Sequence, residues 1–264
     1  MDSRLVMMDN LKKYCNKINR KVKLPSRLDI ERELLSYKLS DYICIPSKHA
    51  QKSFTANGYE EDRTFINPYG VDIENFFPRK HKTIIYDVIM VGTWVMQKGF
   101  DILTEALKTS KLRFLHIGNI GDFSFPKKKE FKHIEHVDQM ELGKYYNMAK
   151  ISILPSRQDG FGLVLSQAMA CGLPIVCTKD TGGEDLKQFL SDDKWIVVIE
   201  KTNAAELKAG ILKALELYDE LPEGYDYMKE SRSELSWRGY GKSYADFLDN
   251  IYWGEKHRGN ETNV

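Results

Sequence analysis

The sequence predicts a doubly wound α/β fold, in which helices cover both faces of a mostly parallel sheet. The first observation is a series of short apolar, β-branched runs, typical of buried strands, at 42–46, 64–67, 87–92, 113–118, 151–155, 174–178 and 195–199. The second is helical spacing of apolar residues between several of these runs, at 100–108, 141–149, 164–171 and 204–217. Helices of this length supply the long crossover connections that parallel strands require.

The order of these elements divides the chain into three parts. Residues 1–83 hold two strand candidates, one good helix at 29–39 and, at 68–82, an aperiodic stretch with two prolines that reads as a linker. Residues 84–236 alternate strands and helices often enough for a complete Rossmann-like domain. Residues 237–264 form an aromatic-rich helix, expected to pack one face back toward the N-terminal part, followed by a polar tail.

The first part is too small for an independent parallel sheet. A strand at 42–46 would have unpaired edges there, so we expect either docking on the following domain or cover from a partner chain or a dimer.

Composition excludes some classes of partner. The 264 residues are 42% hydrophobic, enough for a core, and 39 basic residues against 38 acidic ones leave a net charge of +1. The overall charge therefore gives no reason to expect nucleic acid as a partner, and no nucleic-acid motif is present. Any anion site must be local.

The cysteines and the hydropathy pattern favour a cytoplasmic protein. The four cysteines form no CxxC pair and no His/Cys cluster at metal spacing, so they read as reduced thiols. The sequence shows no signal peptide and no run of about 18 apolar residues that would span a membrane.

The strongest motif lies at 151–172, where the strand ISILPS leads through RQDGFG into the helical run LVLSQAMACG. A strand, a glycine turn and a helix in that order present free backbone N–H groups and a positive helix end to an anion. Gly160 and Gly162 permit close approach, and Asp159 and Gln167 could meet one ligand. The alternative is a tight turn in which Asp159 caps the helix and Gln167 is a half-buried polar residue.

Two further loops follow strands in the same way. In the first, Gly92 ends a strand and Lys98 and Gly99 precede a helix; the lysine would add charge to loop amides that face a phosphate, unless it is merely solvated. Neither GxGxxG nor a P-loop is present, which weakens dinucleotide and P-loop interpretations. The second is TKDTGGEDL at 178–186. Ligands bind beyond the carboxyl ends of parallel strands, so we expect the three loops to converge on one crevice.

Together these segments resemble the group 1 family of retaining glycosyltransferases with the GT-B architecture, in which two Rossmann-like domains face each other. PYGVD with the following FFP resembles the family's interdomain segment, and VGTWVMQKG its diphosphate loop. PSRQDGFGLVLSQAMACGLPIV resembles its signature, and the glycine pair of TGGEDL also matches. The resemblance covers about residues 29–254. It implies that 84–236 bind the donor, whereas 1–83 are the tail end of an acceptor domain.

The resemblance also implies roles for individual residues. Lys98 would hold the diphosphate and Asp159, where the family usually has glutamate, would contact the transferred sugar; these two are the catalytic candidates. Gln167 replaces a second glutamate that usually binds the ribose, and Thr93 stands where many members have arginine. The expected donor-binding set is Gly92, Thr93, Lys98, Gly160, Phe161, Gly162, Leu163 and Gln167.

The chemistry implied by the resemblance is modest. Negative charge develops on the leaving diphosphate, so fixed donors there are the main catalytic device. Retention by front-face attack, with the departing phosphate helping to deprotonate the acceptor, needs no protein nucleophile. No metal and no cofactor is expected, and the nucleotide diphosphate sugar is itself a substrate. His133 and His136 read as surface residues of a polar loop.

The expected function is transfer of a sugar from a UDP- or GDP-sugar donor to a glycan or lipid-linked acceptor. The alternative is a non-catalytic nucleotide-sugar-binding or partner module that needs a separate N-terminal domain. A GT-B epimerase is disfavoured because its acid and base residues are absent. Residues 1–27 carry eight basic side chains and two acidic ones, read either as a solvated helix face or as a contact with an anionic membrane surface.

Overall fold

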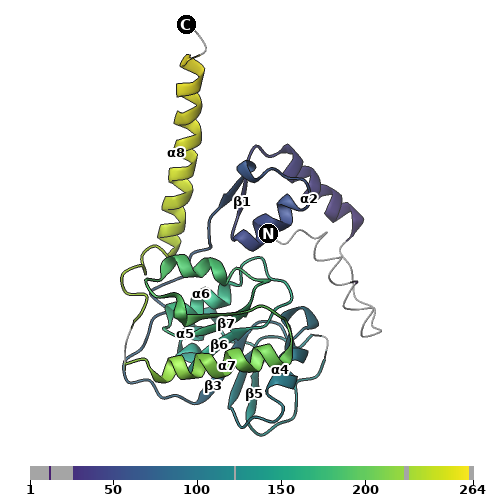
Figure 1. Ribbon diagram of the computed structural model, residues 1–264, viewed down its shortest axis with the longest axis vertical. Helices are drawn as coiled ribbons and strands as arrows, with labels where there is room; N and C mark the ends of the chain where they lie inside the picture. The colour runs from purple at the N-terminus through teal and green to yellow at the C-terminus, as the bar shows by residue number, and fades with distance from the viewer. Residues whose placement is uncertain (1–11, 13–25, 122, 223–225, 262–264) are drawn as a thin grey trace.

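The computed structural model describes Lys12 and residues 26–121, 123–222 and 226–261. Its centre is a six-stranded parallel sheet of order β5-β4-β3-β6-β7-β8 (Figure 1). The strands are β3 (Tyr86–Val91), β4 (Phe114–Ile117), β5 (Phe131–Ile134), β6 (Ala149–Leu154), β7 (Ile175–Thr178) and β8 (Ile196–Ile199). The predicted doubly wound α/β class is therefore confirmed.

Helices cover both faces of this sheet. Helices α4 (Phe100–Ala106) and α7 (Ala204–Asp219) pack together on one face, and α5 (Gln139–Tyr146) and α6 (Leu163–Ala170) pack together on the other. Figure 1 shows α7 and α4 side by side across the lower part of the molecule. This two-sided cover explains why the strands read as continuous apolar runs and not as alternating ones.

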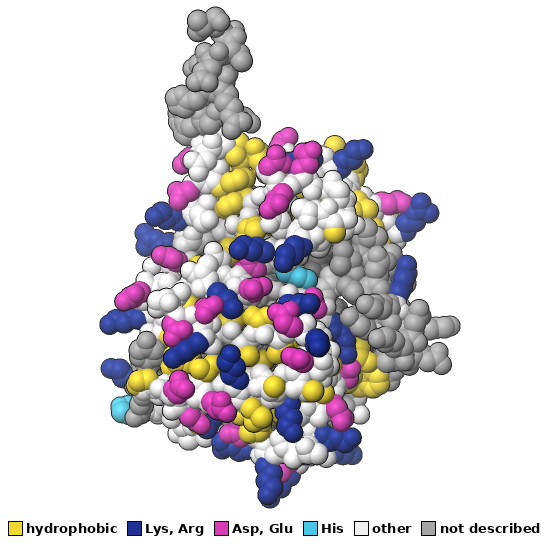
Figure 2. Space-filling view, viewed as in Figure 1, with side chains coloured by type: hydrophobic (Ala, Val, Ile, Leu, Met, Phe, Trp, Pro, Cys, Tyr) yellow, Lys and Arg dark blue, Asp and Glu magenta, His cyan; other side chains and the backbone are white. Residues whose placement is uncertain are grey.

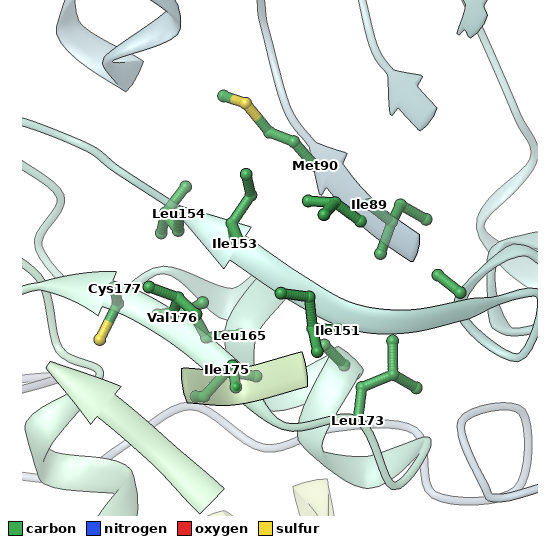
Figure 3. Packing of buried hydrophobic residues seen from close by; sticks show 14 of the residues in the cluster. Ile89, Met90, Ile151, Ile153, Leu154, Leu165, Leu173, Ile175, Val176 and Cys177 are labelled. Carbon is green, nitrogen blue, oxygen red and sulfur yellow. The ribbon is translucent and has the colours of Figure 1, made fainter. Parts of the chain in front are cut away.

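The core lies between these layers. Ile89 on β3, Ile151 and Ile153 on β6, and Ile175 and Val176 on β7 are at most 1% exposed, and Figure 3 shows their side chains projecting from both faces of adjacent strands. Each such side chain contributes about 1.5–3 kcal/mol on burial, so the three central strands anchor the fold.

Some elements differ from the sequence-based expectation. Strand β5 was not predicted, because its four residues FKHI place Lys132 and His133 between only two apolar residues. It places His133 in a strand, so the interpretation of His133 as a loop residue is wrong. The helix expected at 141–149 ends at Tyr146, and Ala149 already begins β6. The segment after TGG is a 3-10 helix, η3 (Glu184–Phe189); two more, η2 (Met96–Lys98) and η4 (Asp193–Trp195), lie in other connections.

The N-terminal part forms a small unit with its own core. It contains α2 (Arg27–Leu39), β1 (Ile43–Ile45), α3 (Lys48–Thr55), the 3-10 turn η1 (Glu61–Arg63) and β2 (Thr64–Ile66). Strands β1 and β2 pair in parallel. Tyr37 and Phe54 pack edge to face with ring centroids 4.9 Å apart and close this core. Helix α3 was not predicted; Ser47 begins it by accepting a hydrogen bond from the Ala50 amide at 3.0 Å.

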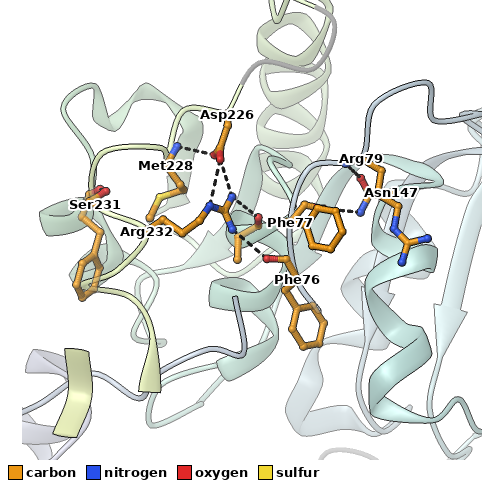
Figure 4. Close-up of polar contacts among 10 residues, drawn as sticks. Phe76, Phe77, Arg79, Asn147, Asp226, Met228, Ser231 and Arg232 are labelled. Carbon is orange, nitrogen blue, oxygen red and sulfur yellow. Dashed lines mark hydrogen bonds and ion pairs between the residues drawn. The ribbon is translucent and has the colours of Figure 1, made fainter. Parts of the chain in front are cut away.

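Two polar side chains, buried Asn147 and half-buried Arg232, tie the linker to the sheet domain (Figure 4). Asn147 donates to the carbonyl of Phe77 at 3.0 Å and accepts from the Arg79 amide at 2.8 Å. Arg232 donates to the Phe76 carbonyl at 3.0 Å and pairs with Asp226 at 2.8 Å. Extended linker backbone is thereby satisfied without strand neighbours.

Helix α8 (Trp237–Glu261) leaves the sheet domain as a long rod (Figure 1). Its Phe247 ring stacks on Phe65 of β2 with centroids 4.0 Å apart. Figure 2 shows hydrophobic side chains gathered below the grey end of this helix, and Tyr244, Leu248 and Tyr252 are 39%, 49% and 57% exposed. Tyr244 also has a ring contact with Phe65, so one aromatic face of the helix packs toward the N-terminal part, whereas Leu248 and Tyr252 remain largely exposed.

The basic N-terminal segment and the cysteines differ in how much of them the structure describes. The basic segment 1–27 lies almost entirely outside the described residues, as does Cys15. Cys44, Cys171 and Cys177 are free thiols, and burial raises the pKa of Cys171 and of Cys177 to about 12. In the described part of the chain, no helix has the length and apolar character needed to cross a membrane.

Replacement of Asn147 by alanine tests the attachment of the linker. Asn147 is 3% exposed, and the change removes the side-chain partner of the Phe77 carbonyl and of the Arg79 amide. We expect the free energy of unfolding, measured by urea titration, to fall by about 2 kcal/mol or more.

Asn57→Ala is the matched control. Asn57 is exposed and donates to the Ser53 carbonyl at 2.7 Å, so its loss should change the unfolding free energy by less than about 0.5 kcal/mol. Equal effects of the two variants would contradict the role given to Asn147.

Candidate functional site

The candidate site lies where the winding of the sheet reverses. Strand β3 stands between β4 and β6: the chain continues from β3 to β4 on one side, and from β6 to β7 on the other. The loops after β3 and β6 therefore leave in opposite directions and open a crevice at the carboxyl ends of these strands. We call residues 92–99 the first loop, 155–162 the second loop and 178–183 the third loop.

The first and second loops hold each other. The Arg157 amide donates to the Gln97 carbonyl at 2.8 Å, and the Arg157 guanidinium grips the carboxylate of Asp101 with two contacts of 2.6 Å. Gly99 has φ +74°, and a Cβ there would lie 2.0 Å from the carbonyl oxygen of Pro155. Only glycine permits this close approach. The approach in turn sets the positions of the Lys98 and Asp159 side chains.

Lys98 and Asp159 meet between these loops. The Lys98 ammonium pairs with Asp159 Oδ2, and the two side chains are 26% and 16% exposed. The sequence places them 61 positions apart, so only the fold brings them together. The ammonium is thus held at the crevice yet remains accessible to an anionic ligand.

Helix α6 begins at the same place. Its N-cap is Gly162, with φ +79° and no side chain that could cap the helix. The Phe161 amide lies 3.5 Å from Asp159 Oδ1. Since the first-turn amides of an α-helix have no intrahelical partner, this end offers donors and a positive dipole end to an anion.

The N-terminal unit closes one side of the site. A cavity of about 310 Å³ is lined by Pro46, Tyr69, Asp159, Gly160, Phe161, Gly162 and Leu163. Tyr69 packs edge to face on Phe161 with ring centroids 5.4 Å apart. The hydroxyl of Ser47 donates to the Gly160 carbonyl. These contacts join Ser47 of the N-terminal unit and Tyr69 of the linker to the second loop.

The start of α3 is also tied to the segment after the third loop. The Lys48 amide donates to Asp185 Oδ1 at 2.9 Å. Burial raises the pKa of this carboxyl, although the Lys48 amide opposes the shift. The N-terminal unit is therefore hydrogen-bonded to the partly desolvated carboxylate of Asp185.

The third loop packs against the second, as the predicted convergence requires. The Gly182 amide donates to the Phe161 carbonyl at 3.1 Å, and the Asp159 amide donates to the Asp180 carbonyl at 2.9 Å. A Cβ on Gly182 would lie 2.7 Å from the Phe161 carbonyl oxygen. The second loop is thus held from both sides.

The predicted site residues fall into two groups. Lys98, Asp159 and the segment 160–163 gather at the cavity or its edge. Gly92 and Thr93 stand at the end of β3, outside the cavity lining, with Thr93 exposed. Gln167 is 6% exposed on α6 and its Oε1 lies 3.5 Å from the Tyr146 hydroxyl. Gln167 is not among the residues that line the cavity.

Sequence reasoning missed the residues contributed by the N-terminal unit and the linker. Pro46, Ser47 and Tyr69 belong to this site by tertiary contact. The pattern Pro-Ser after an apolar strand signals a helix start for Ser47, but nothing in the sequence indicates contact with Gly160. Among the described residues, no cluster of three or more His, Cys, Asp or Glu side chains is placed to hold a metal ion.

The site can be compared with known proteins. The family model described as Glycosyl transferases group 1 matches residues 72–232. An uncharacterized glycosyltransferase of Methanocaldococcus jannaschii is 31% identical over 172 residues, 61% of this chain and 48% of that protein. A D-inositol 3-phosphate glycosyltransferase of Pseudarthrobacter chlorophenolicus is 26% identical over 254 residues, 86% of this chain and 59% of that protein.

Solved structures share the fold. Sucrose-phosphate synthase from Thermosynechococcus elongatus superposes with a TM-score of 0.66 at 18% identity, covering 85% of this chain and 62% of that one. Anabaena HepE in complex with UDP and glucose gives a TM-score of 0.66 at 14% identity, covering 85% and 67%.

The chain spans about half the length of the curated relatives that it matches first, 48% and 52%. The family match covers more than half of this chain and contains all three loops of the site. The chain therefore belongs to the group 1 family of glycosyl transferases, with the Rossmann-like α/β fold of GT-B glycosyltransferases.

Proposed function

We propose that the chain binds a UDP- or GDP-sugar and transfers its sugar, with retention of anomeric configuration, to a glycan or lipid-linked acceptor. The observation that carries this proposal is the Lys98–Asp159 pair at the switch point, beside the uncapped start of α6. A single site there offers a full positive charge, free backbone donors and a carboxylate, which together match a charged diphosphate linked to a hydroxylated sugar.

The proposed role of Lys98 is to stabilise the leaving diphosphate. Breaking the anomeric bond moves negative charge onto the phosphate oxygen, and a donor already fixed there lowers the barrier without reorganisation. The ion pair between Arg157 and Asp101 supports this role because it restrains the end of the loop that carries Lys98. The first-turn amides of α6 would add further donors.

The proposed role of Asp159 is to accept hydrogen bonds from sugar hydroxyls. An ionised carboxylate accepts through two oxygens, and Asp159 lines the cavity together with Gly160 and Phe161. A diphosphate that recruits the Lys98 ammonium would free Asp159 Oδ2 for the sugar. The pair thus couples the two halves of the donor.

The names of relatives support a nucleotide-sugar donor. Anabaena HepE was solved with UDP and glucose, and with UDP-glucose. The fold similarity to that protein extends over 85% of this chain. We infer the same class of donor here, with a hexose as the transferred group.

A second candidate is a nucleotide-sugar-binding module without transfer activity of its own. Two observations favour it: the N-terminal unit has only the β1-β2 pair as its sheet in the described residues, and Gln167 is buried and does not line the cavity. This candidate predicts donor binding without turnover. Sugar transfer, or hydrolysis of the donor, by the 264-residue chain alone would eliminate it.

Lys98→Met tests the diphosphate role. Loss of the ammonium should lower turnover by about 100-fold or more and UDP or GDP affinity by about tenfold, because a charged donor to the phosphate is lost. Stopped assays and calorimetric titration measure the two effects.

Lys108→Met is the control for this change. Lys108 lies just after α4, is 68% exposed and bridges Glu105 at 3.4 Å, so its loss should leave both quantities within about twofold. A Lys98 variant that behaved like this control would remove Lys98 from the mechanism.

Asp159→Asn separates sugar binding from phosphate binding. We expect affinity for the nucleotide sugar to fall by about tenfold, because a charged acceptor is lost, while affinity for the free nucleoside diphosphate is kept or rises as Lys98 loses its partner. Parallel titrations with the two ligands measure the difference.

Asp219→Asn makes the same chemical change on the surface, where Asp219 pairs with Lys150 at 3.0 Å, and should alter neither affinity. An equal loss of both ligands in Asp159→Asn would contradict a sugar contact.

A further inference from the structure

A pair of histidines lies directly behind the first loop. His116 on β4 and His133 on β5 are register partners in neighbouring parallel strands, so their side chains share one face of the sheet. Their Nδ1 atoms are 2.9 Å apart, and His116 Nε2 lies 2.8 Å from the carbonyl oxygen of Gly92. The chain of contacts runs from the edge strand to the first residue of the first loop.

The partners determine where the protons sit. A carbonyl oxygen only accepts, so His116 Nε2 must carry a proton and donate to Gly92. Neutral His116 then has a bare Nδ1, which accepts a hydrogen bond from the Nδ1–H of His133. His116 is fully buried, and desolvation lowers its pKa to about 4, which keeps it in this neutral form near pH 7. His133, half-buried, fixes the tautomer of His116.

This hydrogen bond is one of three constraints on Gly92. The Gly92 amide donates to the Ile117 carbonyl at 2.8 Å, while its carbonyl oxygen accepts from His116. A Cβ on Gly118 would lie only 2.2 Å from that oxygen, so Gly118 leaves just enough room for it. Gly92 itself has φ +137°, which a side chain would disfavour.

Fixing the Gly92 carbonyl also fixes the next amide. In a planar trans peptide the N–H of Thr93 points opposite to the C=O of Gly92, away from His116. Within the described residues, the Thr93 amide donates no hydrogen bond. It is therefore a fixed donor in the loop that also carries Lys98.

The pair is enclosed by aromatic rings. Trp94 lies edge to face on His116 with centroids 4.8 Å apart, and Phe125 stacks near both His116 and His133 at 5.7 and 5.3 Å. Such packing excludes water and leaves the Gly92 carbonyl as the fixed acceptor for His116 Nε2.

We propose that His116, held in its tautomer by His133, is a positioning residue that orients the Gly92–Thr93 peptide so that the Thr93 amide donates to the diphosphate of the donor. This inference rests on the proposed function, since it concerns the same ligand. It assigns a phosphate donor to a loop whose Thr93 side chain lacks the charge of an arginine.

Three variants separate orientation from packing. His116→Gln keeps a donor nitrogen at the distance of Nε2, and so retains the bond to Gly92. His116→Phe keeps ring volume but loses the donor. Phe125→Leu loosens the aromatic enclosure and leaves both hydrogen bonds in place. Each is titrated with UDP or GDP, whichever the unmodified protein binds, and with the monophosphate of the same nucleoside.

The proposal predicts that His116→Phe weakens nucleoside diphosphate binding by about tenfold, as expected for loss of one donor to a charged group, and monophosphate binding by much less. His116→Gln should restore diphosphate affinity to within about threefold, and Phe125→Leu should lower the unfolding midpoint without this selective loss. Equal weakening of both ligands by His116→Phe, or no recovery with His116→Gln, would overturn it.

A ligand-free measurement separates this inference from the proposed function. Nitrogen-15 chemical shifts of the imidazoles should show a proton on Nε2 of His116 and on Nδ1 of His133. A proton on Nδ1 of His116 near pH 7 overturns the inference even where nucleotide binding is intact. Correct tautomers in a folded protein that binds neither UDP nor GDP would instead reject the proposed function, and with it the phosphate role of the Thr93 amide.

Discussion

The site depends on the direct contact between the loops that follow β3 and β6. These strands are neighbours in the sheet, but their connections run in opposite directions, so nothing in the secondary structure holds the loops together. Two contacts supply that restraint: the close approach of Gly99 to Pro155 and the bidentate ion pair of Arg157 with Asp101. The pairing of Lys98 with Asp159 depends on these contacts, because Lys98 is adjacent to Gly99 and Asp159 lies two positions after Arg157.

Further contacts restrain the first loop from the side of the sheet and the second loop from the N-terminal unit and the third loop. Behind the first loop, the imidazole of His116 and the absence of a side chain at Gly118 hold the Gly92 carbonyl. Beside the second loop, Ser47 and Gly182 contact the backbone of Gly160 and Phe161. A site built in this way presents charge and backbone donors at fixed positions, which is what electrostatic stabilisation of a leaving group requires.

Much of the fold could be predicted from the sequence because buried parallel strands are apolar on both faces. Runs such as DVIMVG and PIVCT identify themselves, and glycines at loop positions mark close approaches. Strand β5 could not be predicted because it has only four residues, and two of them, Lys132 and His133, are polar. Such a short polar segment is also typical of a loop. Helix α3 escaped because its eight residues bury only Ala50 and Phe54. Of the site, Lys98 and Asp159 stood out by spacing and resemblance, whereas Ser47, Tyr69 and His116 become visible only through tertiary contacts.

We propose that the crevice between the first and second loops binds a nucleotide diphosphate sugar. Calorimetric titration of the folded 264-residue chain with a UDP-hexose and with a GDP-hexose tests it most directly. We expect saturable binding of one ligand per chain for at least one of the two bases. A protein shown to be folded by its circular dichroism that bound neither would contradict it.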